Sequence, residues 1–198
     1  MSTAAKKAAA KRPVQIYRLR IDLKGVKPKV WRRILVPATI RLDKLHRVIQ
    51  IVMGWTNSHL HEFTIGDAQY GQPEYDDMRS IGSEKGVSLK SALGGIARFT
   101  YVYDFGDDWE HVIKVEEVLP PGIDLTVPTC LDGQNACPPE DVGGPPGYAE
   151  FLEALADPNH ERHKELREWI GGNFDPTAFD PDKVSELIEP RSVRPSMR

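Results

Sequence analysis

The order in which two hydrophobic periodicities follow each other constrains the fold of this chain most strongly. Apolar and polar side chains alternate over residues 14–23 and again over residues 30–36, as strands with one buried face require. Gly25 lies between these segments and indicates a turn, so the chain should open with a β-hairpin. The apolar spacing then becomes that of a helix over residues 42–53, and Gly54 provides a C-terminal stop.

Further strand patterns follow this helix, and helical patterns return only near the C-terminus. Residues 61–65 and 68–70 suggest a short hairpin, and residues 97–105 and 109–119 suggest a longer one rich in aromatic and β-branched residues. The segment 120–147 is proline-rich and has no periodicity, which predicts a long loop. The helical patterns cover residues 148–155, 157–170 and 181–188.

Strands and helices do not alternate along this chain, which argues against a parallel, doubly wound fold. We therefore expect an α+β protein. Its core should be a β-grasp-like antiparallel or mixed sheet crossed by the helix over residues 42–53. The C-terminal part should be helical.

The charge distribution separates two basic ends from an acidic body. Residues 1–13 and 190–198 hold seven of the 26 Lys and Arg residues and none of the 29 Asp and Glu residues, so the remaining 19 basic residues leave the body near −10. We expect a disordered basic arm, a single domain over residues 14–189 and a flexible basic tail. Nucleic-acid affinity depends on neutralising phosphates, so the acidic body argues against a nucleic-acid partner, although the basic ends could contact one weakly.

The sequence contains no pattern that indicates secretion or membrane insertion. No apolar run approaches the ~20 residues that span a bilayer. Residues 1–13 contain lysines without the apolar segment of a secretory signal. Cys130 and Cys137 are the only cysteines, which excludes a disulfide framework and fits a reducing compartment. We expect a cytoplasmic protein that contacts no membrane.

Histidines and carboxylates gather in two segments that could form a metal site. His59 and His61 have an H-x-H spacing, which places two imidazoles on one face of a strand. Asp107, Asp108 and His111 lie at the turn of the second hairpin. Such groups bind Zn²⁺, Mn²⁺ or Mg²⁺ when enough of them converge. The alternative is that the histidines cap a turn and the aspartates satisfy turn N–H groups.

A second set of residues is a candidate binding surface. An aromatic side chain beside two guanidinium groups, as in the Trp-Arg-Arg sequence at 31–33, suits recognition of an anion or a partner, and equally suits salt bridges to the acidic turn at 104–111. Other candidates lie at the acidic turn and in the proline-rich segment. The full set is Trp31, Arg32, Arg33, Asp104, Trp109, Glu140 and Asp141.

Four stretches of unusual composition run through the chain: VWRRI at 30–34, MGWTNSHLHEF at 53–63, YDFGDDWEH at 103–111 and CLDGQNACPPEDVGGPPGY at 130–148. Together they resemble the plasmid pRiA4b ORF-3-like family over roughly residues 14–189. Some members carry labels such as resolvase or transposon-associated protein, so the resemblance implies a link with mobile elements and no defined activity. Relatives often have cysteine where this chain has Val142, which argues against a cysteine-based metal site.

No phosphate-binding glycine loop, nucleophile elbow or HExxH helix occurs in the sequence. Two hypotheses about function remain. The first is a non-enzymatic binding or interaction module for an unknown protein or small ligand, associated with mobile elements. The alternative is a metal-binding or metal-dependent hydrolase-like protein that uses the His and Asp cluster.

Overall fold

The computed structural model describes residues 14–73, 81–121, 125 and 127–188, which form an eight-stranded sheet and five helices. The strands are β1 Ile16–Leu23, β2 Trp31–Pro37, β3 His61–Ile65, β4 Ala68–Gly71, β5 Gly82–Ser83, β6 Arg98–Tyr103, β7 Trp109–Leu119 and β8 Thr129–Gln134. The helices are α1 Leu42–Met53, α2 Leu89–Leu93, α3 Gly144–Ala156, α4 His163–Ile170 and α5 Pro181–Ile188. The expected arm over residues 1–13 and tail over residues 190–198 lie outside the described residues.

The strand order in the sheet is β5-β4-β3-β6-β7-β1-β2-β8. All neighbours are antiparallel except β4 and β5, which are parallel. The α+β class and the mixed sheet expected from the sequence are therefore confirmed. The finer likeness to a β-grasp stays a prediction.

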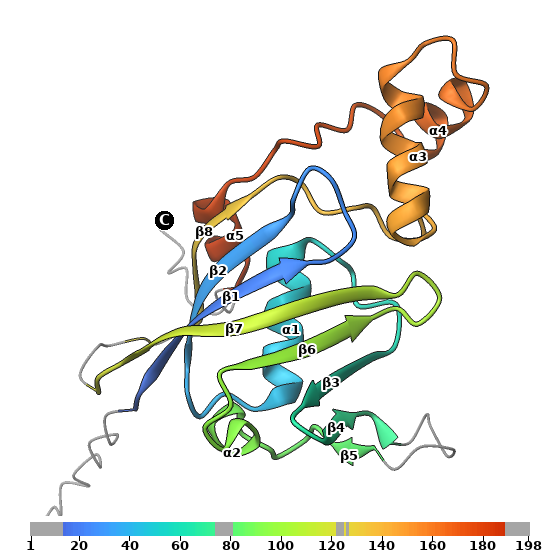
Figure 1. Cartoon of the computed structure of the whole chain (residues 1–198). Helices are drawn as coiled ribbons and strands as arrows, with labels where there is room; N and C mark the ends of the chain where they lie inside the picture. Colours follow the sequence, from blue (N-terminus) through green and yellow to red (C-terminus); the bar gives the residue numbers. More distant parts are fainter. Residues whose placement is uncertain (1–13, 74–80, 122–124, 126, 189–198) are drawn as a thin grey trace, which may run out of the picture.

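Helix α1 crosses one face of this sheet and lies behind it in Figure 1. Its inward residues Leu42, Leu45 and Ile49 are fully buried, and they join the inward residues of the central strands, such as Leu19 and Ile21, in one core. Each such side chain contributes about 1.5–3 kcal/mol by leaving water. The helix ends at Gly54, whose φ of 97° is left-handed, as the sequence pattern predicted.

The C-terminal helices divide into two groups. Helices α3 and α4 pack on each other and project beyond the sheet, whereas α5 returns to lie beside α1 and β8 (Figure 1). Ser185 fixes α5 to β8, because its hydroxyl donates to the Cys130 carbonyl and accepts from the Cys130 N–H, both at 3.0 Å. This arrangement creates a space between α5 and the C-terminal end of α1.

Two differences from the sequence-based expectations concern the proline-rich segment and the helix after it. The segment 120–147 contains the edge strand β8, which pairs with β2 through a register shift and so lacks a regular apolar alternation. Helix α4 begins at His163 because Asp157 instead closes a turn, in which its side chain accepts a hydrogen bond from the Asn159 N–H at 2.9 Å.

Candidate metal centre

Side chains from three distant segments meet at one edge of the sheet. His59 lies two residues before β3, Asp104 directly follows β6, and Asp141 lies in the loop between β8 and α3. Strands β3 and β6 are antiparallel with His61 opposite Tyr103, so the start of one strand and the end of the other come to the same edge. The pairing of these two strands therefore brings His59 and Asp104 together.

The imidazole of His59 lies among three carboxylates. Its Nε2 atom is 3.1 Å from Asp141 Oδ1, 3.6 Å from Asp104 Oδ2 and 3.7 Å from Glu140 Oε2. One ligand atom each from His59, Asp104 and Asp141 can be chosen so that all lie within 4.8 Å of one another. Although this Nε2 atom is buried, it has no hydrogen-bond partner among the described residues. The contacts are thus close enough for attraction but are not aligned as hydrogen bonds.

Asp104 is held in place by the turn that follows β6. Its backbone is left-handed, with φ at 58°, which short polar residues tolerate better than most. Its Oδ1 atom accepts hydrogen bonds from the N–H groups of Gly106 at 2.9 Å and Asp107 at 3.4 Å. Because the turn occupies Oδ1, the other oxygen faces His59.

The loop that carries Asp141 is fixed to the same turn. Asp107 Oδ2 accepts a hydrogen bond from the Gly143 N–H at 3.2 Å. The backbone approaches so closely here that a Cβ atom on Gly144 would lie 2.5 Å from the carbonyl oxygen of Asp107. Asp141 itself has a left-handed φ of 59°. The turn after β6 therefore positions both aspartates of the cluster.

Glu140 is oriented by neighbours on its other side. Its Oε1 atom accepts from the Thr56 N–H at 2.7 Å and from the Thr56 hydroxyl at 3.0 Å. The Tyr103 hydroxyl donates to both carboxylate oxygens at 3.2 Å, and burial raises the pKa of this tyrosine to about 12. In the described part of the chain, neither Lys nor Arg forms an ion pair with Asp104, Glu140 or Asp141. Crowded carboxylates of this kind attract a cation.

The predicted metal-site residues divide between this cluster and other places. His59 joins it, but His61 is buried and turns to Glu84, with its Nε2 atom 2.8 Å from Glu84 Oε2. Asp107 holds the neighbouring loop, and Asp108 continues the turn with φ at 53°. His111 is fully buried in β7, where burial lowers its pKa to about 4.

A second buried polar group surrounds His61. Its ring stacks on that of His46 at 3.4 Å, and His46 Nδ1 lies 2.7 Å from the Tyr101 hydroxyl. Burial, and next the adjacent His61, lower the pKa of His46 to about 4. Gln50 also donates to the Tyr101 hydroxyl, at 3.1 Å. These contacts place His61 in a network inside the core, apart from the carboxylate cluster.

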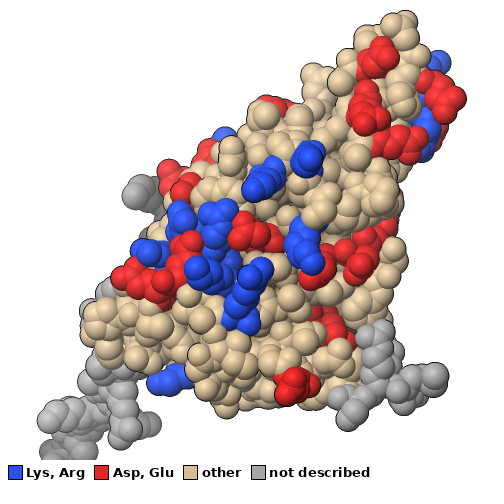
Figure 2. All heavy atoms as spheres, viewed as in Figure 1, with Lys and Arg blue, Asp and Glu red and all other residues tan. Residues whose placement is uncertain are grey.

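The candidate binding residues also separate. Trp31 and Arg33 lie on the sheet face opposite α1, where the Arg20 and Arg33 guanidinium groups lie 4.1 and 5.2 Å from the Trp31 ring centroid. Arg33 pairs with Glu116 at 2.7 Å and with Asp132 at 3.1 Å. Figure 2 shows the resulting mixture of basic and acidic side chains over β1, β2 and β7. The charges on this face largely pair with each other, and the carboxylates that pair with Arg33 lie on β7 and β8 and not in the acidic turn.

Two other candidates point inward. Arg32 is buried on the α1 side of the sheet, and Trp109 is buried against Trp55 with ring centroids 6.0 Å apart. Asp104, Glu140 and Asp141 of this set meet at His59. Two buried polar residues, His46 and Glu84, were not predicted from the sequence. No local pattern marks them as buried, because His46 is on an amphipathic helix and Glu84 is in a polar segment.

Comparison with known proteins gives the kinship of the chain. Residues 15–183 match the family model described as plasmid pRiA4b ORF-3-like protein, and the chain belongs to this family. The uncharacterized protein y4hQ of Sinorhizobium fredii (strain NBRC 101917 / NGR234) is 46% identical over 177 residues, which cover 88% of this chain and 91% of y4hQ.

A solved structure has the same fold. The crystal structure of MM3350, a protein of unknown function from Methanosarcina mazei Go1, is 38% identical and superposes with a TM-score of 0.80. The match covers 87% of this chain and 97% of MM3350. Neither relative's name states an activity. Among the described residues, no helix has the length and apolar character needed to cross a membrane.

Proposed function

We propose that this protein binds one divalent metal ion through His59, Asp104 and Asp141, with Glu140 beside them. The observation that carries the proposal is the buried His59 Nε2 atom, which has no hydrogen bond among the described residues although three carboxylates surround it. A buried polar nitrogen normally has a partner. A metal ion would supply that partner and would also offset the negative charge of the carboxylates.

The spacing of the ligand atoms supports this proposal. Two atoms that each bind a metal at about 2.1 Å lie roughly 3.0 Å apart at a right angle and roughly 3.4 Å apart at a tetrahedral angle. The distances from His59 Nε2 to Asp141 and Asp104, 3.1 and 3.6 Å, are close to these values. Glu140, at 3.7 Å, could complete the set after a small movement.

The chemistry of these ligands favours Zn²⁺ or Mn²⁺. Imidazole nitrogen suits Zn²⁺ and other transition metals, whereas Mg²⁺ and Ca²⁺ prefer oxygen ligands alone. A hollow of about 400 Å³ adjoins His59 and is also lined by Asn57, Ser58 and Gln72. An ion held by three protein groups beside such a hollow would keep a position for an external ligand.

Both functional hypotheses can use this site. A bound metal supplies a Lewis acid and an activated water, which is the chemistry that a hydrolase needs. In a non-enzymatic module the same ion would anchor an anionic group of a partner. The ligand geometry favours metal binding without choosing between these two uses, and the link with mobile elements stays a prediction from family labels.

Metal binding can be tested on protein purified without a chelator or a polyhistidine tag. We expect elemental analysis and calorimetric titration with ZnCl₂ and MnCl₂ to give one equivalent of metal, and we expect the bound metal to raise the melting temperature. The His59→Gln variant should lose the binding, and the matched variant His160→Gln, which changes a histidine outside the cluster, should retain it. Wild-type protein that takes up neither metal would overturn the proposal.

A further inference from the structure

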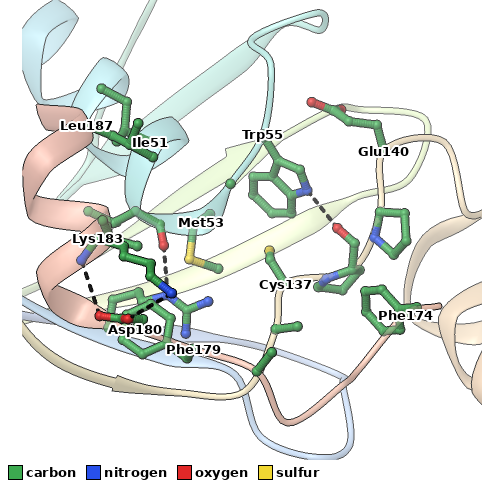
Figure 3. Close-up of a pocket in the computed structure, with 18 of the residues that line it drawn as sticks. Ile51, Met53, Trp55, Cys137, Glu140, Phe174, Phe179, Asp180, Lys183 and Leu187 are labelled. Atoms are coloured by element: carbon green, nitrogen blue, oxygen red, sulfur yellow. Dashed lines mark hydrogen bonds and ion pairs between the residues drawn. The ribbon is translucent and has the colours of Figure 1, made fainter. Parts of the chain in front are cut away.

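A second cavity lies between the C-terminal end of α1, the loop after β8 and helix α5. Its volume is about 560 Å³, which is within the usual range for small-molecule sites. Figure 3 shows Lys183 and Leu187 of α5 on one side and Trp55 and Phe174 on the other, with Met53 and Cys137 between them. Most of the lining is apolar, and Leu187 is 63% exposed at its edge. The cavity is therefore suited to an apolar group.

A buried cation lines this apolar cavity. Arg32 is only 1% exposed, and its Nε donates to the Val52 carbonyl at 2.7 Å. Its Nη1 donates to the carbonyls of Trp31 at 2.8 Å and Gln134 at 2.9 Å. These bonds use three of the five guanidinium N–H groups. In the part of the chain that the structure describes, the Nη2 amino group has no acceptor.

The positive charge of Arg32 is not balanced by the residues around it. Within the described residues Arg32 forms no ion pair, and the titratable groups that act on it are the thiols of Cys137 and Cys130. Burial raises the pKa of both thiols, so at neutral pH they stay uncharged. Phe179 covers one face of the guanidinium, at 3.9 Å from its ring centroid. Buried charges are usually paired, so an unpaired one beside a cavity points to an anionic ligand.

We propose that this cavity binds a small monocarboxylate with an apolar body. The free Nη2 group offers donors for one carboxylate, and a single negative charge would balance the single positive charge of Arg32. A phosphate dianion would leave a net charge buried beside the single charge of Arg32. The apolar body would lie against Met53 and Phe174, between α1 and α5.

Calorimetric titration of the full chain with three probes tests this assignment. Octanoate carries both the charge and the apolar body, octan-1-ol keeps the body alone, and acetate keeps the charge alone. We expect octanoate to bind at least roughly tenfold more tightly than octan-1-ol, because a hydrogen bond to a charged group is stronger than one between neutral groups. Acetate should not bind measurably. Equal binding of octanoate and octan-1-ol, or no binding of octanoate, would contradict the proposal.

Two variants locate the binding. Arg32→Met should remove the preference for octanoate over octan-1-ol. Because Arg32 is buried and its substitution could disturb folding, Ala178→Trp provides a second test. Ala178 is exposed at the rim of the cavity, so a tryptophan there should block entry without disturbing the core. Ala149→Trp, on the exposed side of α3, is the matched control and should bind octanoate normally. Unchanged octanoate binding by Ala178→Trp would place the ligand elsewhere and overturn the assignment.

Discussion

Asp141 is the most exposed of the three carboxylates around His59, with 70% of its side chain accessible. Because so little of it is buried, Asp141→Asn should leave the melting temperature of the metal-free protein nearly unchanged. It should nevertheless weaken Zn²⁺ or Mn²⁺ binding by roughly tenfold or more, since it removes a charged ligand. Calorimetric titration of wild type and variant at one ionic strength measures this difference.

Asp108→Asn is the control for this change. Asp108 lies in the same acidic turn and also has a left-handed backbone, but it is not part of the cluster. Its substitution should leave the metal affinity within roughly twofold of wild type, because Asp108 supplies no ligand atom and water weakens the effect of its exposed charge. An equal loss of affinity in both variants would show that the metal responds to general negative charge, and the assigned ligands would be wrong.

Gly144 is the residue at which loop and turn approach most closely within the cluster. Gly144→Ala would place a Cβ atom 2.5 Å from the Asp107 carbonyl oxygen, on a backbone with φ at 68°. Gly94→Ala is matched in conformation, with φ at 52°, but meets nothing within 4 Å. The left-handed backbone alone should reduce the free energy of unfolding by about 1–2 kcal/mol in both variants. Gly144→Ala should reduce it clearly more, because of the close contact, and should also weaken metal binding. Equal losses of unfolding free energy in urea would mean that this close approach is unimportant.

At the scale of elements, the buried pair His61–Glu84 joins β3 to the segment after β5. Glu84→Ala should reduce the free energy of unfolding by about 1–3 kcal/mol, because it leaves a buried imidazole without its partner. Metal affinity should not change, since neither residue belongs to the cluster. The exposed pair Lys24–Glu110 has nearly the same N–O distance, 2.7 Å against 2.8 Å, and Glu110→Ala should reduce the free energy of unfolding by under about 1 kcal/mol. Similar costs for both variants in urea unfolding would contradict this account.

The elements with strong periodicity could be predicted from the sequence, and the site could be predicted only in part. Strands β1, β2, β6 and β7 and helix α1 follow their apolar patterns. The turn containing Asp104 was recognisable from its composition. The H-x-H spacing predicted that His59 and His61 share one face of a strand, but β3 begins only at His61. His59 therefore lies before the strand and meets other groups. The contact of Asp141 with His59 depends on how the loop after β8 folds back, which no local pattern reveals.

For the whole molecule, two buried histidines make stability depend on pH. The pKa values of His46 and His111 fall from 6.5 to about 4, chiefly through burial. Below about pH 6.5 the unfolded chain binds protons that the folded chain does not, so stability is lost as the pH falls toward about 4. Each histidine contributes at most about 1.4 kcal/mol per pH unit. Urea unfolding across this range should show the decline, and His111→Gln should make it shallower. A stability that is flat across the range would contradict these pKa shifts.

The central claim is that His59 and its carboxylates form a metal centre. Anomalous diffraction from crystals grown with MnCl₂ tests it most directly, because the anomalous signal identifies the element and its position together. We expect a manganese peak about 2.0–2.3 Å from His59 Nε2 and from carboxylate oxygens of Asp104 and Asp141. An anomalous map without a peak among these three residues, from crystals containing saturating manganese, would contradict it.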